Sequence, residues 1–329
     1  MERRVEGEKS GSLSKNKRQR RIKMDFIEFQ NSVIEELELR HPSDRVRVET
    51  MTKNNNLRLT GVCIIKDGLK CSSVVYLESF YNSDITTEEI HDVVCEIERV
   101  IEEHSDEGLS ELVSNLNDFN YAKKKIFYQV INTEKNQSML EKCPNRSILD
   151  VSVVYKINVF DERAGEATIS IKNELLKIWG VTEEDLWRCA IKNTPLMFPL
   201  KYANIFKTMS EIVERFDNEL PKMLLSLLDN DEGHNLIIVV TNKQMKFGAS
   251  TILYKDVLKK IYDEFGKNFY IALSSIHEFL VFPKDKVVGP DELKSIVKSV
   301  NREQVSIEEV LSDNVYYYDG ELNKLSIVQ

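Results

Sequence analysis

The chain has 329 residues, of which 42% are hydrophobic, and its formal net charge is −9 at pH 7. A chain of this length can bury most of the surface that it exposes when unfolded, so one large or two modest globular units are expected. Its longest aliphatic run, residues 236–240, is far shorter than the ~20 residues that cross a bilayer, and no membrane partner is expected. The first residues lack the apolar core of a secretion signal, so a cytoplasmic location is expected.

The charge is distributed unevenly along the sequence. Residues 1–23 hold nine Lys or Arg and three Glu, a balance of +6, whereas the rest of the chain carries −15. The basic segment has no apolar periodicity and cannot join a core, so we expect 1–23 to be a disordered basic extension. An acidic body repels phosphate backbones, and nucleic acid is therefore not expected as a partner except through this arm.

Metal and cofactor signatures are missing from the sequence. The five cysteines are scattered and never spaced as CxxC, which argues against a disulfide framework and a zinc ribbon. His91 and Cys95 are one helical turn apart, but no second ligand pair accompanies them, so a flanking helix surface is the favoured interpretation. Neither GxGxxG nor a P-loop motif occurs. No cofactor and no metal are therefore predicted.

The first part of the body combines helices with alternating apolar patterns. The expected elements are a helix over 24–40, strands over 46–51, 57–64 and 73–80, and a second helix that begins at Thr86. The second helix begins there because Glu89, three residues after Thr86, completes a capping box. We therefore predict an α+β unit over 24–108, made of a helix, a three-stranded antiparallel meander and a helix.

Residues 109–329 are predicted to form a larger C-terminal α+β domain. Strands are expected over 126–131, 149–159, 167–171, 236–241, 269–273 and 279–282. Helices are expected over 109–119, 134–141, 206–228, 251–265 and 290–300. A further helix is expected to begin at Thr182 and to be ended by Pro195 and Pro199. This succession indicates a mixed sheet flanked by helices, so the fold class expected for the whole chain is α+β.

The most informative stretch is a compact polar cluster, Ser274-Ser275-Ile276-His277-Glu278, between two apolar strands. Hydroxyls, an imidazole and a carboxylate are the groups that acid-base and nucleophilic catalysis use. His277 and Glu278 point to opposite faces of an extended segment, so a third catalytic group must come from elsewhere. The candidate catalytic residues are Ser274, Ser275, His277, Glu278, Asn301 and Asp313, with Asp319 as a further possible donor of the third group.

A structural interpretation of this cluster is favoured over catalysis. The two serines then make turn hydrogen bonds, and His277 is a satisfied, half-buried histidine. A zinc-protease motif would need a second histidine four residues after His277, and that position is Val281 in a predicted strand.

Two other features also receive structural interpretations. Asp150 and Glu166 flank a predicted hairpin, but Thr168 stands where a metal-dependent nuclease would place a lysine, so both carboxylates are expected to be exposed strand-end charges. The run Tyr316-Tyr317-Tyr318 has the composition of a binding platform, although such aromatic runs more often cover the edge of a core.

Several short segments together carry a resemblance to a known family. They are residues 176–179, Thr182-Glu183-Glu184-Asp185-Leu186, residues 190–193, Thr241-Asn242-Lys243 with Gly248-Ala249, Ser274-Ser275-Ile276-His277-Glu278, and Val310-Leu311-Ser312-Asp313 with Tyr316. In this combination the chain resembles, from about residue 24 to residue 318, the bacterial family catalogued as domain of unknown function 5688. The resemblance implies a bacterial, cytoplasmic α+β protein. It assigns no activity and no residue roles.

Two classes of function remain after these exclusions. The favoured class is a non-enzymatic accessory or interaction protein, whose partner would be another protein or a small ligand. The alternative is a hydrolase or other small-molecule enzyme that uses the cluster around His277. The sequence leaves open whether the protein is an enzyme.

Overall fold

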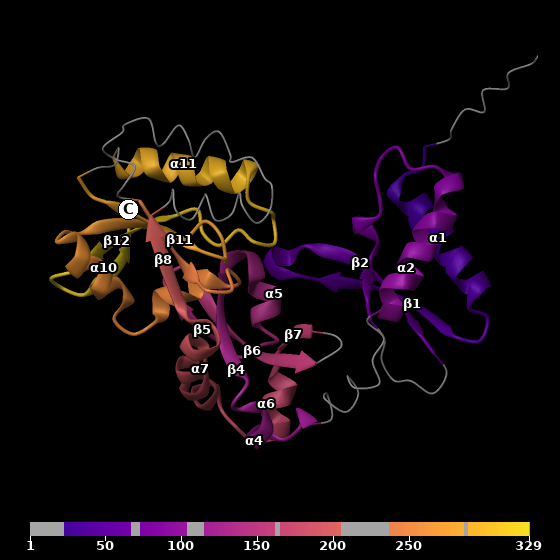
Figure 1. The fold of residues 1–329 in the computed structure, drawn as a ribbon, viewed down its shortest axis with the longest axis horizontal. Helices are drawn as coiled ribbons and strands as arrows, with labels where there is room; N and C mark the ends of the chain where they lie inside the picture. Colours follow the sequence, from indigo (N-terminus) through magenta and orange to yellow (C-terminus); the bar gives the residue numbers. More distant parts are fainter. Residues whose placement is uncertain are drawn as a thin grey trace, which may run out of the picture. The chain divides into compact units, whose positions relative to one another are not determined.

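A computed structural model of the chain describes residues 23–66, 73–103, 115–161, 165–204, 237–285 and 289–328 (Figure 1). The predicted helix 206–228 lies outside the described residues, and so do nearly all of the predicted basic extension and most of the predicted linker helix 109–119. The chain divides into two compact units. The first comprises Met1–Val48 and Gly61–Glu103, and the second comprises Glu49–Thr60 and His104–Gln329. The domain ranges expected from the sequence, 24–108 and 109–329, stay predictions. In the structure the tip of the first hairpin, Glu49–Thr60, groups with the second unit.

The first unit consists of two packed helices and a small sheet. Its elements are α1 (Phe26–Arg40), β1 (Arg45–Thr52), β2 (Arg58–Ile65), β3 (Val75–Tyr76) and α2 (Ile90–Glu103), with β1 and β2 continuing into the second unit. The strand order is β1-β2-β3. The buried residues of α1, including Phe29 and Leu37, share one core with Val94 and Ile97 of α2. Helix, three-stranded sheet and helix therefore occur as predicted, although the third strand is shorter than the expected 73–80.

Capping boxes fix the starts of both helices in the first unit. Asp25 accepts a hydrogen bond from the Glu28 N–H (2.9 Å), and the Glu28 carboxylate accepts one from the Asp25 N–H (3.1 Å). Thr86 and Glu89 form the second box, as the sequence predicted, and a short 3₁₀ turn precedes α2. These contacts satisfy amide groups that the first turn of a helix otherwise leaves without partners.

A four-stranded antiparallel sheet, which we call the small sheet, begins the second unit. It contains β4 (Ile126–Asn132), β5 (Asn145–Ile148), β6 (Val151–Asp161) and β7 (Gly165–Ser170), and β6 pairs with the other three. The predicted strand 149–159 corresponds to β6. Strand β5, which was not predicted, precedes it and is joined to it by a tight turn in which Leu149 has a φ of 56°. Helices α4 (Phe119–Ala122), α5 (Gln137–Leu140), α6 (Asn173–Trp179) and α7 (Glu183–Met197) accompany this sheet.

A six-stranded sheet, which we call the large sheet, completes the second unit. Its strands are β8 (Leu200–Asn204), β9 (Ile238–Asn242), β10 (Phe269–Ala272), β11 (Phe279–Pro283), β12 (Val315–Asp319) and β13 (Lys324–Ile327), in the order β13-β12-β10-β11-β9-β8. Every pairing is antiparallel. The α+β class is confirmed. In place of one mixed sheet, the described residues of this unit form two antiparallel sheets.

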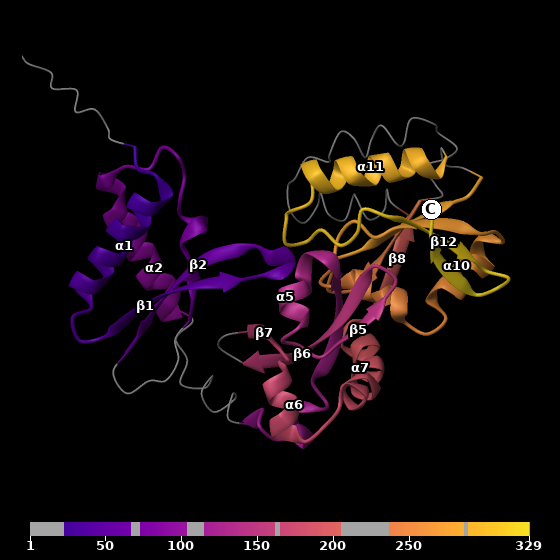
Figure 2. The ribbon, with the colours of Figure 1, turned by 180° about the vertical axis from the view of Figure 1, so that it is seen from behind.

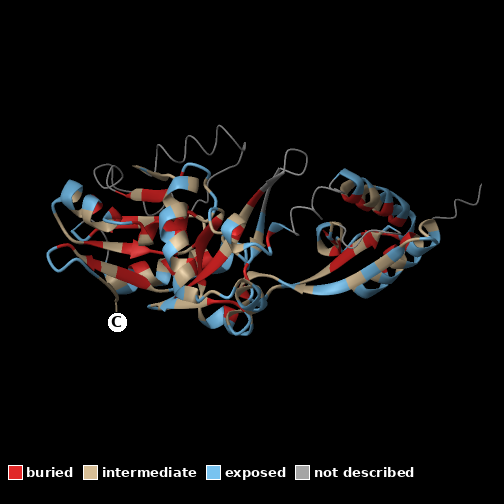
Figure 3. Cartoon of the chain, turned by 90° about the horizontal axis from the view of Figure 1, so that it is seen from below, coloured by how far each residue is buried: buried red, intermediate tan, exposed pale blue. Residues whose placement is uncertain are grey.

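Helices cover both faces of the large sheet (Figure 2). Helix α10 (Val257–Phe265) packs on one face through Val257 and Ile261, in the core that this sheet shares with the small sheet. Helix α11 (Pro290–Glu303) packs on the other face through Leu293 and Val297. Buried residues accordingly follow the strands of this unit (Figure 3). None of the helices in the described ranges is long and apolar enough to cross a membrane.

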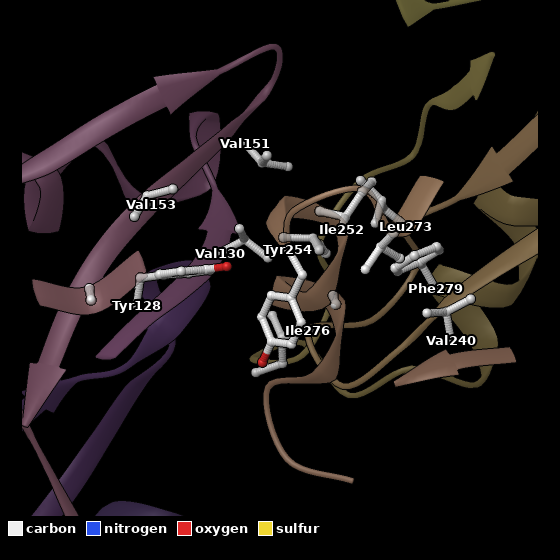
Figure 4. Packing of buried hydrophobic residues seen from close by; sticks show 14 of the residues in the cluster. Tyr128, Val130, Val151, Val153, Val240, Ile252, Tyr254, Leu273, Ile276 and Phe279 are labelled. Carbon is white, nitrogen blue, oxygen red and sulfur yellow. The ribbon is translucent and has the colours of Figure 1, made fainter. Parts of the chain in front are cut away.

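The main core lies between the two sheets (Figure 4). Tyr128 and Val130 of β4 project from the small sheet toward Ile252 and Tyr254. Ile252 belongs to the 3₁₀ helix η6 (Gly248–Leu253), and Tyr254 follows it. Ile276, from the polar cluster, is 6% exposed and joins the same core. The central residue of the cluster is therefore a packing residue that holds its polar neighbours in place.

The outer edge of β4 is closed by side chains rather than by another strand. Thr194 of α7 accepts the Tyr128 N–H through Oγ1 (3.1 Å), and Ser250 of η6 accepts the Val130 N–H through Oγ (3.1 Å). An edge strand with free amides would be a template for pairing with another chain. Helix α7 contains Pro195 and ends at Met197, between the two prolines, Pro195 and Pro199, that were expected to end it.

The hairpin tip that groups with the second unit is held through Asn55, which has a φ of 57° and is 8% exposed. Its amide group donates to the carbonyls of Ile307 (2.7 Å) and Val310 (2.6 Å). Its N–H and its Oδ1 bond with the side chain of Asn136. The tip therefore fixes the segment 307–310, which carries Glu309.

Candidate functional site

The polar cluster is held by a short antiparallel bridge to the segment 309–312. The Ile276 N–H donates to the Glu309 carbonyl (2.9 Å), and the Leu311 N–H donates to the Ser274 carbonyl (2.8 Å). Ser275 and Val310 form the bridge pair. This pairing, between residues that are far apart in the sequence, brings the Glu309 side chain beside His277.

Both nitrogens of the His277 ring have partners. The Phe247 N–H donates to Nδ1 (3.3 Å), and Nε2 lies 3.2 Å from Oε1 of Glu309. Because a backbone amide can only donate, Nδ1 is the acceptor nitrogen, and Nε2 carries the proton that is shared with Glu309. The ring also stacks against Phe247, with 6.3 Å between ring centroids. His277 is therefore fixed in one orientation by three contacts.

Gly248 permits the close approach of η6 to the cluster. A Cβ on this residue would lie 2.1 Å from the His277 carbonyl oxygen and 2.1 Å from Oγ1 of Thr241. Those two atoms are themselves hydrogen-bonded, at 2.7 Å. The Ala249 N–H adds a bond to the Ile276 carbonyl (3.2 Å). The backbone of η6 thus rests directly on the backbone of the cluster.

The hydroxyl of Ser275 acts within the cluster's own turn. Its Oγ accepts the His277 N–H (3.0 Å), and the residue is only 6% exposed. Burial raises the pKa of the half-buried Glu278 carboxyl, and the nearby His277 and Ser275 only partly offset this effect. Relative to the unfolded chain, folding therefore favours the protonated form of Glu278, so the contribution of this group to stability falls as the pH rises through its titration range. Ser274 is bound to its neighbours through its carbonyl.

The three candidates for a third catalytic group lie elsewhere. Asn301 donates to the Ser312 carbonyl (2.9 Å) and to Oδ1 of Asp313 (2.7 Å), so these two candidates bond with each other. Asp319 accepts the N–H groups of Glu321 (3.1 Å) and Leu322 (3.0 Å) in the β12–β13 turn. None of them forms a hydrogen bond with His277 in the described part of the chain.

Sequence reasoning did not find Glu309, the residue that pairs with His277. Its sequence context, Glu308-Glu309-Val310-Leu311, offers no motif. The available signal was the apolar pair Val310-Leu311, which begins one of the segments that carry the family resemblance and is consistent with a short strand. Only the bridge to Ser275 places the carboxylate within reach of the ring.

Comparison with known proteins gives one family. The model of the family of unknown function DUF5688 matches residues 26–320. The chain belongs to this family. No curated protein and no solved structure matches it. The resemblance inferred from the sequence is thereby confirmed, and the polar cluster lies inside the matched range.

A second buried polar group in the DUF5688 chain surrounds Asp150. Its carboxylate accepts hydrogen bonds from Ser312 Oγ (2.6 Å), Asn314 Nδ2 (3.0 Å) and the Tyr316 hydroxyl. Burial and the Asp150 charge raise the pKa of Tyr316 above its ordinary value. Asp150 was expected to be an exposed strand-end charge, and that prediction is wrong, because the carboxylate is half-buried and joins the small sheet to β12 and the segment before it. The Glu166 side chain lies outside the described residues.

His91 and Cys95 of the DUF5688 chain both contact the guanidinium group of Arg40. Nη1 of Arg40 lies 3.2 Å from Cys95 Sγ, and Nη2 lies 2.6 Å from His91 Nδ1. Arg40 also forms ion pairs with Glu36 and with Glu98 (2.9 Å). In the described ranges no group of three or more His, Cys, Asp or Glu side chains has an arrangement that would hold a metal ion. The helix surface at His91 is thus an ion-pair network.

Proposed function

We propose that this DUF5688 protein is a non-enzymatic accessory or interaction protein. The observation that carries the proposal is that both ring nitrogens of His277 already have partners. These partners are the Phe247 amide and the Glu309 carboxylate. A general base needs a nitrogen that faces the proton of the nucleophile. Ser275 instead directs its oxygen at the His277 backbone amide. These contacts support a structural role for His277, which links η6 and the residue before it to the segment 309–312.

The charge of the chain supports a particular kind of partner. The sequence after residue 23 carries −15, which attracts a basic surface and speeds its association. We therefore propose a basic protein as the partner. A contact of this kind weakens with salt, because mobile ions screen exposed charges beyond about 10 Å at 0.1 M.

The first test asks whether either serine is a nucleophile. The full chain is treated with a fluorophosphonate, which forms an adduct with activated serines, and the peptides that contain Ser274 and Ser275 are measured by mass spectrometry. We expect no adduct at either residue, under conditions that label a serine hydrolase in the same tube. An adduct that is present in the wild type and lost in His277→Gln would overturn the proposal in favour of a hydrolase.

The second test asks whether a basic partner exists. The tagged full chain is cross-linked in its native cells, isolated at low and at high salt, and its partners are quantified. We expect one stoichiometric basic protein whose yield without cross-linking falls as the salt concentration rises. If the chain is recovered alone at low salt after cross-linking, the interaction proposal fails.

A further inference from the structure

Two asparagines of the hairpin tip, Asn54 and Asn55, hold the segment that carries Glu309. Their amide groups donate to three carbonyls of this segment, those of Ile307 (2.7 Å), Glu308 (2.6 Å) and Val310 (2.6 Å). Farther along, the Leu311 N–H donates to the Ser274 carbonyl (2.8 Å), so the chain is bound there to the polar cluster. The tip therefore supports residues 307–310, whereas Leu311 is held independently of it.

The docking of the tip is polar. None of the side chains of 49–60 joins the hydrophobic clusters of the described residues or packs against them. Oδ1 of Asn54 is buried without a hydrogen-bond partner in the described part of the chain, which disfavours the docked state. Regions with few buried apolar contacts open locally while the rest of a protein stays folded. The docked tip should therefore be less stable than the main core.

The bonds that shape the tip are internal to it. The Lys53 N–H donates to the Leu57 carbonyl (2.7 Å), and the Leu57 N–H donates to the Asn54 carbonyl (3.3 Å). Asn55 and Asn56 have φ values of 57° and 59°, a left-handed conformation that asparagine adopts more readily than most residues. The tip can therefore leave the segment and return to it without losing its own turn.

Glu309 connects the supported segment to the polar cluster through two bonds. Its carbonyl accepts the Ile276 N–H (2.9 Å), and its carboxylate lies 3.2 Å from Nε2 of His277. We propose that the tip, docked on 307–310, is a releasable clasp: when it opens, Glu309 leaves His277, and the ring keeps only its contacts with Phe247. A ligand that prefers the open clasp would shift the chain toward it. The clasp is independent of the proposed function, because it requires no partner.

Native-state hydrogen exchange of the full chain tests whether the clasp opens by itself. The amides of Asn55 and Ile276 lose their acceptors when the clasp opens, whereas the Val130 amide is bound to Ser250 at the main core. We expect Asn55 and Ile276 to exchange with one shared opening free energy, below that of Val130. Their exchange should also depend more weakly on denaturant, because local opening exposes little surface.

Two matched variants test the side chain that closes the clasp. Asn55→Gly removes the amide group, and glycine adopts the left-handed conformation without steric cost. Asn56→Gly is the control, because Asn56 has the same backbone conformation and an exposed side chain without a hydrogen bond in the described ranges. Exchange at Ile276 should be at least about ten-fold faster in Asn55→Gly than in Asn56→Gly, because the lost side chain makes three hydrogen bonds.

Reaction with diethyl pyrocarbonate measures whether His277 is released with the clasp. The reagent acylates an imidazole nitrogen whose lone pair is free. In the closed state Nδ1 accepts the Phe247 amide, and Nε2 carries the proton that is shared with Glu309. The rate at His277, followed by mass spectrometry, should rise in Asn55→Gly by about the same factor as the exchange at Ile276. Asn56→Gly should react like the wild type.

No such clasp exists if Asn55 and Ile276 of the wild type exchange only with Val130, by global unfolding. Equal exchange at Ile276 in the two variants, or faster exchange in Asn55→Gly with an unchanged rate at His277, would overturn the proposal as well. If Asn55→Gly does not fold, the wild type decides alone. Its His277 should then be protected from the reagent, relative to free histidine, to the same extent as the Ile276 amide is protected from exchange, and unequal protection rejects the clasp.

Discussion

Replacement of Asp150 by alanine is expected to lower the free energy of unfolding of the second unit by about 3 to 5 kcal/mol. The carboxylate accepts three hydrogen bonds, from Ser312, Asn314 and Tyr316. Ser312 and Tyr316 are almost completely buried, so their hydroxyls would lose their partner without gaining water. Chemical denaturation followed by tryptophan fluorescence measures this unit, because both tryptophans, Trp179 and Trp187, lie in it.

Two control variants separate the hydrogen-bond network from the loss of charge. Asp150→Asn keeps an oxygen for Tyr316 but places an amide against the donors of Ser312 and Asn314, so its loss should be intermediate. Glu321→Ala removes an exposed carboxylate from the β12–β13 turn of the same unit and should change stability by less than about 0.5 kcal/mol. If Asp150→Ala unfolds with the same midpoint as Glu321→Ala, the network has no stabilising role.

Asp150 also illustrates what could not be predicted from the sequence. Its position at the end of an apolar strand was visible, but its environment depends on Ser312, Asn314 and Tyr316, more than 160 positions away. Nothing local distinguishes an exposed carboxylate in a turn from one that joins two sheets. The same applies to Glu309, which reaches His277 only through the bridge between Ser275 and Val310.

Helices with one buried face were predicted well, whereas strands with two buried faces were predicted unevenly: β10 and β11 were found from their apolar runs, and β12 was missed. Helices α1, α2 and α11 were predicted from an apolar stripe with a capping residue or a proline at the start, which is a local signal. Strand β12 was read as an aromatic run, because both of its faces are covered and no polar alternation remains. Its burial becomes clear only when α11 and the main core are seen on opposite sides.

The polar cluster was located correctly in the sequence as the junction of two strands, but its geometry belongs to the tertiary structure. His277 and Glu278 were expected to diverge, and in the structure His277 pairs with Glu309 while Glu278 is half-buried with a raised pKa. The roles of the candidate residues remain predictions. What the structure adds is a set of backbone contacts around His277 that a single substitution can disturb.

Gly248→Ala is the substitution that should disturb those contacts most. Its Cβ would meet two atoms at 2.1 Å, the His277 carbonyl oxygen and Thr241 Oγ1, and the Thr241 Cα at 2.9 Å. Backbone cannot give way as the end of a flexible side chain does, so η6 must move away from the cluster. We expect a loss of about 2 to 4 kcal/mol in the free energy of unfolding, measured by denaturation with fluorescence detection.

The same movement should release His277, which gives Gly248→Ala a second readout. In the wild type, ¹⁵N spectra of the imidazole groups should show Nδ1 of His277 as an unprotonated acceptor, held by the Phe247 amide. In the variant this signal should change toward that of a ring free in water. Gly289→Ala is the matched control, because its Cβ would meet no atom within 4 Å; Gly289 is the N-cap residue of α11, so the variant should lose no more than about 1 kcal/mol and should leave the His277 signal unchanged. Equal stability of the two variants, with an unaltered His277 signal, would show that η6 does not depend on this close approach; a stable variant with a changed signal would instead separate the orientation of His277 from the packing that surrounds it.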